Sequence, residues 1–391
     1  MNKELLSRLD RFRLIALVVG LIGLVLCAVG AFVNTQQFFI SFLYGSLSWL
    51  GLALGCFGVA MIHHLTGGRW GQVTRRFLEA GFMTLPVMAF LFAPICFGLK
   101  FLYPWAQPTT VADDIILQHR QAYMNPAMFV VRAVIAFIIW MVITQLLRKW
   151  SLQQDTTRDV EPTRRLRSLS GPGIVLYPLT ATFVYVDWIM SLEPHWYSTM
   201  FVVIICIGQI LAAYALCIIL LSWFGQFKPL SEVVTATHFH HLGNLLLTFV
   251  MFWTYVSFGQ LLIIWSGNLP DETVWYLHRI AGGWKGIVWF LFLFHFFLPF
   301  FILLFRNSKR NPQALMMLAT IVFVAHFVSV YWFIAPSFYP TGFHVSWLDF
   351  AALFGVGGLW VATFISLLMG PSLIPLNDPR VEHQIIEAHA K

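Results

Sequence analysis

Runs of about 20 apolar residues recur along the chain, and a run of this length is what an α-helix needs to cross a membrane. Ten runs are present, separated by short polar segments. We therefore predict an all-α polytopic membrane protein with about ten transmembrane helices. The predicted spans are about 13–33, 39–62, 80–101, 126–147, 172–192, 199–223, 242–266, 285–305, 312–334 and 346–369.

The composition excludes several other classes of protein. Of the 391 residues, 59% are apolar and 10% are charged, whereas soluble domains carry about 25% charged residues. This balance argues against a soluble enzyme, a disordered chain and a disulfide-stapled secreted domain. The five cysteines all lie in apolar runs without a Cys-x-x-Cys pair, so we predict packing residues and no metal site. The sequence has neither a Gly-rich phosphate loop nor a basic domain, so nucleic acid is not an expected partner.

The basic residues alternate between the two sides of the predicted membrane. Of the 24 lysines and arginines, 19 fall in the N-terminal segment, the tail and alternate loops, four lie on the other side, and Arg132 lies within a span. Cytoplasmic segments carry the excess of Lys and Arg, so both termini are predicted to be cytoplasmic. The expected division is an N-terminal segment 1–12, one transmembrane domain 13–369 and a cytoplasmic tail 370–391.

Ionisable residues near the outer ends of the spans form the first candidate site. Arg132 lies early in span four and Asp187 late in span five, each about 8–9 Å below the outer boundary. Glu193 and His195 follow, and Asp349 begins span ten. An Arg132–Asp187 ion pair is geometrically possible. Either it fixes helix packing, or these groups handle protons near the outer face.

The second candidate site is a polar stripe on span seven. His240, Asn244, Thr248 and Tyr255 are separated by four, four and seven residues, which keeps them near one helix face. Such a stripe can conduct protons, or it can make ordinary hydrogen bonds between helices. Further ionisable residues on the inner side are His63, His64, Glu79, His238 and His241.

Two histidines on adjacent spans lie at equal depth. His295 and His326 are each about 12–15 Å below the outer boundary, which is what bis-histidine ligation of a haem requires. The neighbouring residues are bulky phenylalanines, whereas a haem needs small residues around it. We therefore expect buried, hydrogen-bonded histidines here and no haem or metal ligand in this chain.

Four stretches carry a resemblance to a known family. They are HHLTGGRWG from His63 to Gly71, RRFLEAGFMTLP from Arg75 to Pro86, DWIMSLEPHWYSTMF from Asp187 to Phe201, and FGQLLIIWSGNLPDETVWYL from Phe258 to Leu277. Together with the ten spans, they resemble the ActF membrane subunit of bacterial alternative complex III, a quinol:electron-acceptor oxidoreductase. ActF is related to the NrfD/PsrC-type membrane subunits. The resemblance covers nearly the whole chain up to Pro371.

The resemblance implies a fold, a location and a set of partners. The fold is two four-helix bundles, about 39–192 and 199–334, with the first and last helices peripheral, in a bacterial inner membrane. The partners are an ActC-like homologous membrane subunit, an iron–sulfur protein, haem c subunits and small membrane subunits, together with lipid. The haems and iron–sulfur clusters belong to those partners, and quinol oxidation occurs mainly in the ActC-like subunit.

Three functions remain open from the sequence. The first is a non-haem subunit of a quinol-oxidising electron-transfer complex that supports proton conduction and assembly without being the catalytic quinol site. The second is a subunit that binds quinol itself, at residues the sequence does not identify. The third is a secondary transporter, which usually shows broken helices or inverted repeats around a midplane site.

Overall fold

The computed structural model describes residues 3–375 and residue 377, and this part of the chain is helical without strands. Within it, ten helices are long and apolar enough to cross a membrane, which confirms the predicted polytopic fold. Their bounds are Lys3–Val33 (α1), Thr35–Thr66 (α2), Arg69–Phe82 with Leu85–Phe97 (α3 and α4), Pro126–Thr156 (α8), Glu161–Trp188 (α9), Phe201–Phe224 (α10), Ala236–Gly267 (α12), Trp284–Phe290 with Leu298–Leu304 (α14 and α15), Pro312–Ile334 (α17) and Trp347–Met369 (α18).

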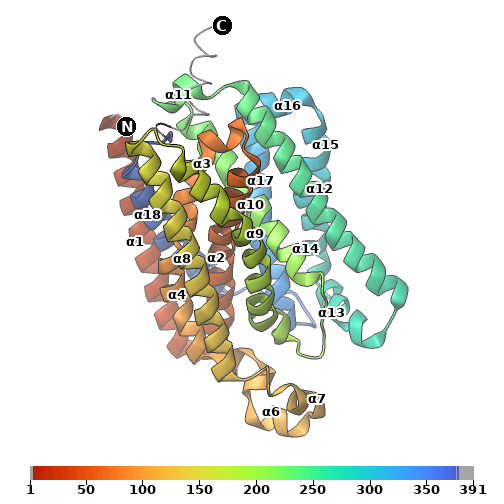
Figure 1. Cartoon of the computed structure of the whole chain (residues 1–391). Helices are drawn as coiled ribbons and strands as arrows, with labels where there is room; N and C mark the ends of the chain where they lie inside the picture. The colour runs from red at the N-terminus through yellow and green to blue at the C-terminus, as the bar shows by residue number, and fades with distance from the viewer. Residues whose placement is uncertain (1–2, 376, 378–391) are drawn as a thin grey trace.

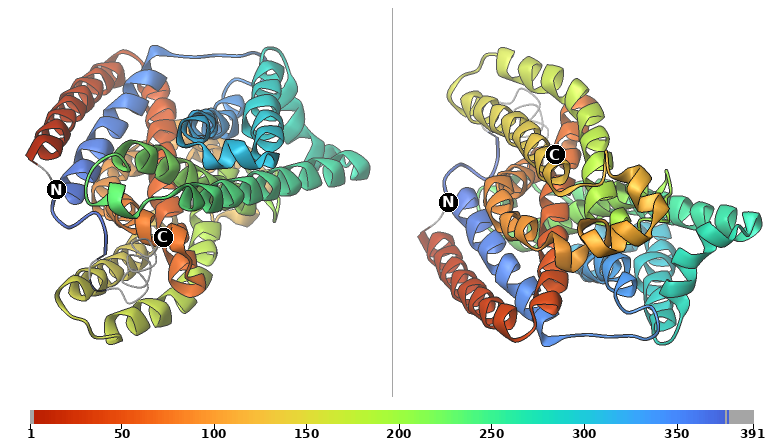
Figure 2. Two further views of the ribbon diagram at one scale, coloured as in Figure 1. Left: turned by 90° about the horizontal axis from the view of Figure 1, so that it is seen from above. Right: turned by 90° about the horizontal axis from the view of Figure 1, so that it is seen from below.

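The spans form the two predicted bundles with a peripheral pair. Helices α2, α3–α4, α8 and α9 pack into one bundle, and α10, α12, α14–α15 and α17 into the other. The bundles meet where α2 packs against α10, near the centre of the molecule (Figure 2). Helix α1 lies at the edge against α18, and α18 lies against α2. We name the end where α1 begins and α18 ends the terminal face, and the other end the opposite face (Figure 1).

Small residues set how closely α1 approaches α18. A Cβ atom built on Gly23 would lie only 2.5 Å from the Cα of Gly355, so the two backbones touch. Gly20 and Gly358 make a second contact of the same kind one turn away. Close backbone approach at small residues is a common way for membrane helices to associate, because apolar burial does not drive association in lipid.

The third span is longer and more polar than predicted. It begins at Arg69, about eleven residues before the expected start, and bends at Met83 and Thr84 between α3 and α4. Pro86 lacks the N–H that would bond to the carbonyl of Phe82, which accounts for the bend. The prediction that Arg75 and Arg76 lie in a loop is therefore wrong.

The connection predicted at 148–171 is mostly helical. Helix α8 continues to Thr156 and α9 already begins at Glu161, so the true connection is four residues long. The predicted N-terminal segment 1–12 is likewise helical from Lys3, as part of α1. Most of the predicted tail 370–391 lies outside the described residues.

Short helices fill the remaining connections. On the opposite face, the segment before α8 forms two small helices, α6 and α7, and α13 precedes α14 (Figure 1). A π-helical stretch, η3, joins α14 to α15 in the eighth span. The short elements are Leu99–Leu102 (α5), Pro104–Ala106 (η1), Pro108–Asp113 (α6), Ile115–Arg120 (α7), Met190–Leu192 (η2), Leu230–Val233 (α11), Pro270–Ile280 (α13), Leu291–Phe297 (η3), Arg306–Arg310 (α16) and Ala335–Ser337 (η4).

Candidate functional site

The ion pair considered between spans four and five is present. Arg132 Nε donates to Asp187 Oδ2 at 2.6 Å, and its Nη2 donates to Asp187 Oδ1 at 3.0 Å. The same guanidinium donates to the carbonyl of Tyr123 and lies 3.9 Å from the centre of that ring. Burial, together with the charge of Asp187, raises the pKa of Tyr123 to about 12. The phenol is therefore neutral at physiological pH, beside a fully formed pair.

Glu193 belongs to a second network on the opposite face. Its carboxylate accepts hydrogen bonds from Arg279 Nη1 at 2.6 Å and from the Ser337 hydroxyl at 2.7 Å, and it lies 3.1 Å from His278 Nδ1. Arg279 is buried and also donates to the carbonyl of Phe333. This network ties α13 to the end of α17. Arg279 is the central residue of this network, although the sequence indicated only a basic residue in a loop.

The remaining outer residues lie elsewhere, so the predicted outer cluster is not one site. His195 Nε2 lies 2.8 Å from Asp114 Oδ2, at the start of α7. Asp349 Oδ1 accepts a hydrogen bond from Ser41 at 2.5 Å, and its Oδ2 accepts the backbone N–H of Ser346 as a helix cap. Tyr331 also donates to Asp349. Their positions at the outer ends of the predicted spans placed these residues at one depth, but each contacts different neighbouring elements.

The largest buried charge cluster lies near the terminal face. Glu79 Oε1 accepts from Arg75 Nε at 2.9 Å, and its Oε2 accepts from Arg76 Nη1 at 2.7 Å and from Arg148 Nη1 at 2.8 Å. Ser151 donates to the same carboxylate, and Asp155 pairs with Arg76. We name these six residues the Glu79 cluster. It joins α3 to α8, with the charges of three arginines and two carboxylates almost balanced.

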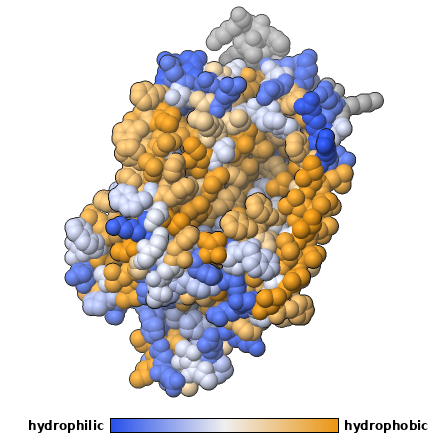
Figure 3. Space-filling model, turned by 180° about the vertical axis from the view of Figure 1, so that it is seen from behind, coloured by the Kyte–Doolittle hydropathy of each residue, from blue (hydrophilic) through white to orange (hydrophobic). Residues whose placement is uncertain are grey.

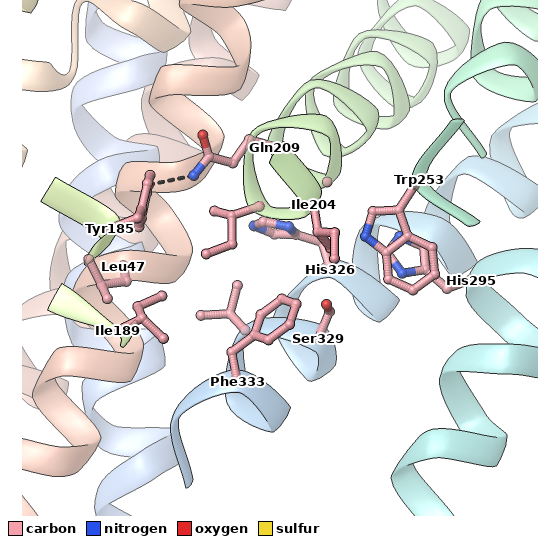
Figure 4. A pocket seen from close by; sticks show the side chains of 13 residues that line it. Leu47, Tyr185, Ile189, Ile204, Gln209, Trp253, His295, His326, Ser329 and Phe333 are labelled. Carbon is pink, nitrogen blue, oxygen red and sulfur yellow. Dashed lines mark hydrogen bonds between the residues drawn. The ribbon is translucent and has the colours of Figure 1, made fainter. Parts of the chain in front are cut away.

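A small cavity lies between the bundles, near the middle of the spans. Its volume is about 20 Å³, which is room for about one water molecule. Figure 4 shows His326 in the centre of its wall, with His295 and Trp253 to one side and Tyr185 and Gln209 to the other. The prediction that the two histidines lie at equal depth on neighbouring helices agrees with this common cavity.

His295 has no hydrogen bond within the described part of the chain, so the prediction of a hydrogen-bonded histidine is wrong at this position. Neither of its ring nitrogens has a partner among the described residues, and the side chain is 1% exposed. His326 Nε2 lies 3.2 Å from the carbonyl of Ser48, as expected for a bonded histidine. His295 is held in the π-helical stretch η3, and the ring of Trp253 packs 4.2 Å from it. π-Bulges of this kind often occur at functional sites.

A chain of hydrogen bonds leads away from the cavity. Gln209 on α10 donates to the hydroxyl of Tyr185 on α9 (dashed line in Figure 4) and accepts from the hydroxyl of Tyr177 at 2.8 Å. Tyr177 and Tyr185 are eight residues apart on α9, or about 12 Å along its axis. The chain therefore extends from the cavity toward the terminal face. In the sequence, Gln209 is a polar residue within a long apolar run, and this isolation is the signal that marks it.

The polar stripe of span seven does not face the bundle interior. Asn244, Thr248 and Tyr255 are exposed on the outside of α12, and His240 is partly exposed. Asn244 and His240 come within 3.5 Å of one another, while Thr248 donates to the carbonyl of Asn244 on its own helix. The helical spacing correctly predicted one face, and that face is exposed on the outside of α12.

Two observations concern metal and haem binding. Within the described residues, no group of three or more His, Cys, Asp or Glu side chains is arranged to hold a metal ion. The indole of Trp253 packs against His295, so an aromatic side chain occupies space that a haem on the histidine pair would need.

No family model matched the chain, and no curated protein matched it in a sequence search.

Proposed function

We propose that this chain is a non-haem integral membrane subunit of a quinol-oxidising electron-transfer complex of the alternative complex III type, in which buried polar groups conduct protons. The observation that carries the proton role is the unpartnered His295 beside a cavity near the middle of the spans. The four ActF-like stretches support the complex. The chain itself need not be the catalytic quinol site.

A histidine suits this position chemically. A neutral imidazole presents one nitrogen that accepts a proton and another that donates one, and its ordinary pKa lies near physiological pH. One water in the cavity would reach His295 from the hydroxyl of Ser329, which also lines the wall. Phe333 lines the cavity too, and its carbonyl binds Arg279 of the Glu193 network. The cavity thus lies between the opposite face and the Tyr185–Gln209–Tyr177 chain.

Quinol binding at the histidine cavity is the weaker alternative. Sites for small organic molecules usually have volumes of about 300 Å³ or more, whereas the histidine cavity has about 20 Å³. We therefore assign quinol oxidation to an ActC-like partner beside an iron–sulfur protein. Haem c and iron–sulfur clusters belong to the partners. Replacing His326 with Ala should leave the haem content per complex unchanged, and loss of one b-type haem would contradict this assignment.

A secondary transporter is also less well supported. The bend in the third span keeps its backbone bonded: the N–H of Met83 bonds to the carbonyl of Glu79, and that of Thr84 to Gly81. Transporter sites at broken helices instead expose unwound backbone to the substrate. The exposed polar stripe on α12 fits contact with a partner subunit, because polar side chains bond across helices in membranes.

Purification separates these functions. A complex subunit extracted in mild detergent should elute with haem-staining polypeptides and quinol oxidase activity, whereas a transporter should elute alone. The proposed location is a bacterial inner membrane with both termini cytoplasmic. Reporter fusions after Pro340 and after Lys391 should report opposite sides, and finding both on the same side would contradict the topology.

A further inference from the structure

The flank of the molecule beside α1 carries an apolar groove. It has a volume of about 570 Å³ and lies between α1, α10 and α18, with Trp49 of α2 in its wall. Figure 3 shows the apolar face hollowed next to the edge that α1 forms. The groove is separate from the histidine cavity and from every charged network described above.

The walls of the groove are set by how α1 is attached. The glycine contacts hold α1 directly on α18. Near the terminal face α1 also contacts α10, where the rings of Phe12 and Trp223 lie 6.0 Å apart. Because α1 and α10 touch there, a further transmembrane helix, about 10 Å in diameter, does not fit between them. An extended hydrocarbon chain is thin enough to lie in the groove.

The groove extends over roughly one leaflet. On α1 it is lined from Leu9 to Val19, a rise of about 15 Å, and on α18 from Phe354 to Leu368, a rise of about 21 Å. Half of a hydrocarbon core about 30 Å thick is about 15 Å deep. On α10 the lining residues, Leu216 to Phe224, lie at the C-terminal end of that helix. The groove therefore belongs to the leaflet on the side of the terminal face.

The lining is built for hydrocarbon. The only lining side chains with polar atoms are the indoles of Trp49, Trp223 and Trp360, and Trp49 already donates to the carbonyl of Leu353. A quinone ring carries two carbonyl oxygens on opposite edges, and this wall offers few donors for them. An acyl chain needs none.

Charged side chains flank Leu9 and Phe12, the α1 residues that line the groove nearest the terminal face. Residues 4–13 of α1 hold three basic and two acidic side chains. Arg8 pairs with Glu4 and Arg13 with Asp10, while Arg11 is exposed one residue before Phe12. Basic groups at a membrane surface attract anionic lipid headgroups. We propose that the groove is a binding site for an anionic phospholipid, with one acyl chain between α1 and α10 and the headgroup at Arg11.

The test uses the full chain in detergent, loaded from vesicles of equal phosphatidylglycerol and phosphatidylcholine. Native mass spectrometry should show retained phosphatidylglycerol in preference to phosphatidylcholine. Ile219→Trp, which fills the groove from α10, should abolish retention, whereas Val25→Trp on the exposed side of α1 should not. Arg11→Gln should lower retention about fivefold, and Arg158→Gln, an exposed arginine in the connection between α8 and α9, should leave it unchanged.

Three results would overturn the proposal. The first is equal retention of phosphatidylglycerol and phosphatidylcholine. The second is equal retention of phosphatidylglycerol by Ile219→Trp and Val25→Trp. The third is that the unmodified protein releases a prenylquinone, and no phospholipid, when its bound lipids are extracted. Because Ile219→Trp changes a helix inside the second bundle, its thermal stability is measured alongside. Should it unfold, Ala16→Phe fills the same groove from α1 and takes its place.

Discussion

The Glu79 cluster and the histidine cavity are both polar regions inside membrane spans, but they are organised in opposite ways. In the cluster, one carboxylate accepts hydrogen bonds from three arginines and a serine, so its oxygens are saturated. In the cavity, a neutral imidazole has space beside it and no hydrogen bond. The first arrangement fastens helices together, and the second leaves a titratable group free to exchange a proton.

The difference follows from the cost of burying charge. A buried ion costs several kcal/mol unless close partners compensate it, so the arginines and Glu79 must stay paired for the fold to persist. A neutral histidine costs much less when left unpaired, of order 1–3 kcal/mol. A protein can keep such a group unpaired where chemistry needs it. The comparison therefore predicts large stability effects in the cluster and small ones at His295.

The largest effect is expected from Glu79→Gln. The change leaves Arg75, Arg76 and Arg148 without their shared carboxylate, and breaking a buried ion pair in this way costs about 3–5 kcal/mol. We expect little folded protein, measured as monodisperse material after size-exclusion chromatography. Glu161→Gln, which removes an exposed partner of Arg165, is the matched control and should change the yield little. Normal yield of Glu79→Gln would show that the cluster does not hold the fold.

A smaller loss is expected at the Arg132–Asp187 pair, which is less enclosed. Asp187→Asn should destabilise the protein by about 2 kcal/mol, because Arg132 loses a charged acceptor in a partly buried site. Thermal unfolding of the single and double variants, with Arg132→Gln as the second change, measures the coupling between the two side chains.

The same variants separate structure from proton handling at this pair. If the pair only fixes packing, the double variant recovers stability and the assembled complex turns over normally. If Asp187 handles protons, assembly stays largely intact while quinol oxidation or proton release slows. Normal turnover per assembled complex in Asp187→Asn would reject the proton role, whatever the yield.

At His295 no loss of stability is expected, and the effect on function should be larger. His295→Phe removes two unpaired nitrogens from a buried position, so stability should stay the same or rise by about 1–3 kcal/mol. Proton release coupled to quinol oxidation should slow by roughly a hundredfold, the lower range for loss of an acid–base group. Trp289→Phe, an exposed aromatic change in the same span, is the control. Unchanged proton release would remove the cavity from the proposed function.

The number of spans was predictable because each needs its own apolar run, but their ends were not. Three charged residues so close together, Arg75, Arg76 and Glu79, suggested a loop because each charge was treated as unpaired. In the structure both arginines form ion pairs with Glu79, so the helix continues through this segment. Their spacing of three and four residues was an available signal for such pairing. For α12, periodicity identified the polar face, but only the positions of neighbouring helices decide whether that face points inward.

The smallest effect is expected where the same kind of pair lies in water. Asp114 caps α7 through the backbone N–H groups of Ile116 and Leu117, and it lies beside His195. Slight desolvation raises the pKa of Asp114, but the bond from Leu117, the charge of His195 and the bond from Ile116 outweigh it and lower the pKa below its ordinary value. A carboxyl with a lowered pKa stabilises the fold above its unfolded pKa of about 4 and stops doing so as the pH falls through its folded pKa.

The α6–α7 segment should therefore loosen below about pH 4 while the membrane spans stay folded. A spin label attached at Thr109→Cys, an exposed position in α6, reports this as increased mobility between pH 7 and pH 3. In Asp114→Asn the label should be more mobile at every pH, with no step below pH 4, because the titrating cap is gone. A step of equal size in that variant would assign the transition to another group. Such a result would show that the exposed Asp114 contacts do not stabilise the α6–α7 segment, in contrast to the buried ion pairs of the Glu79 cluster.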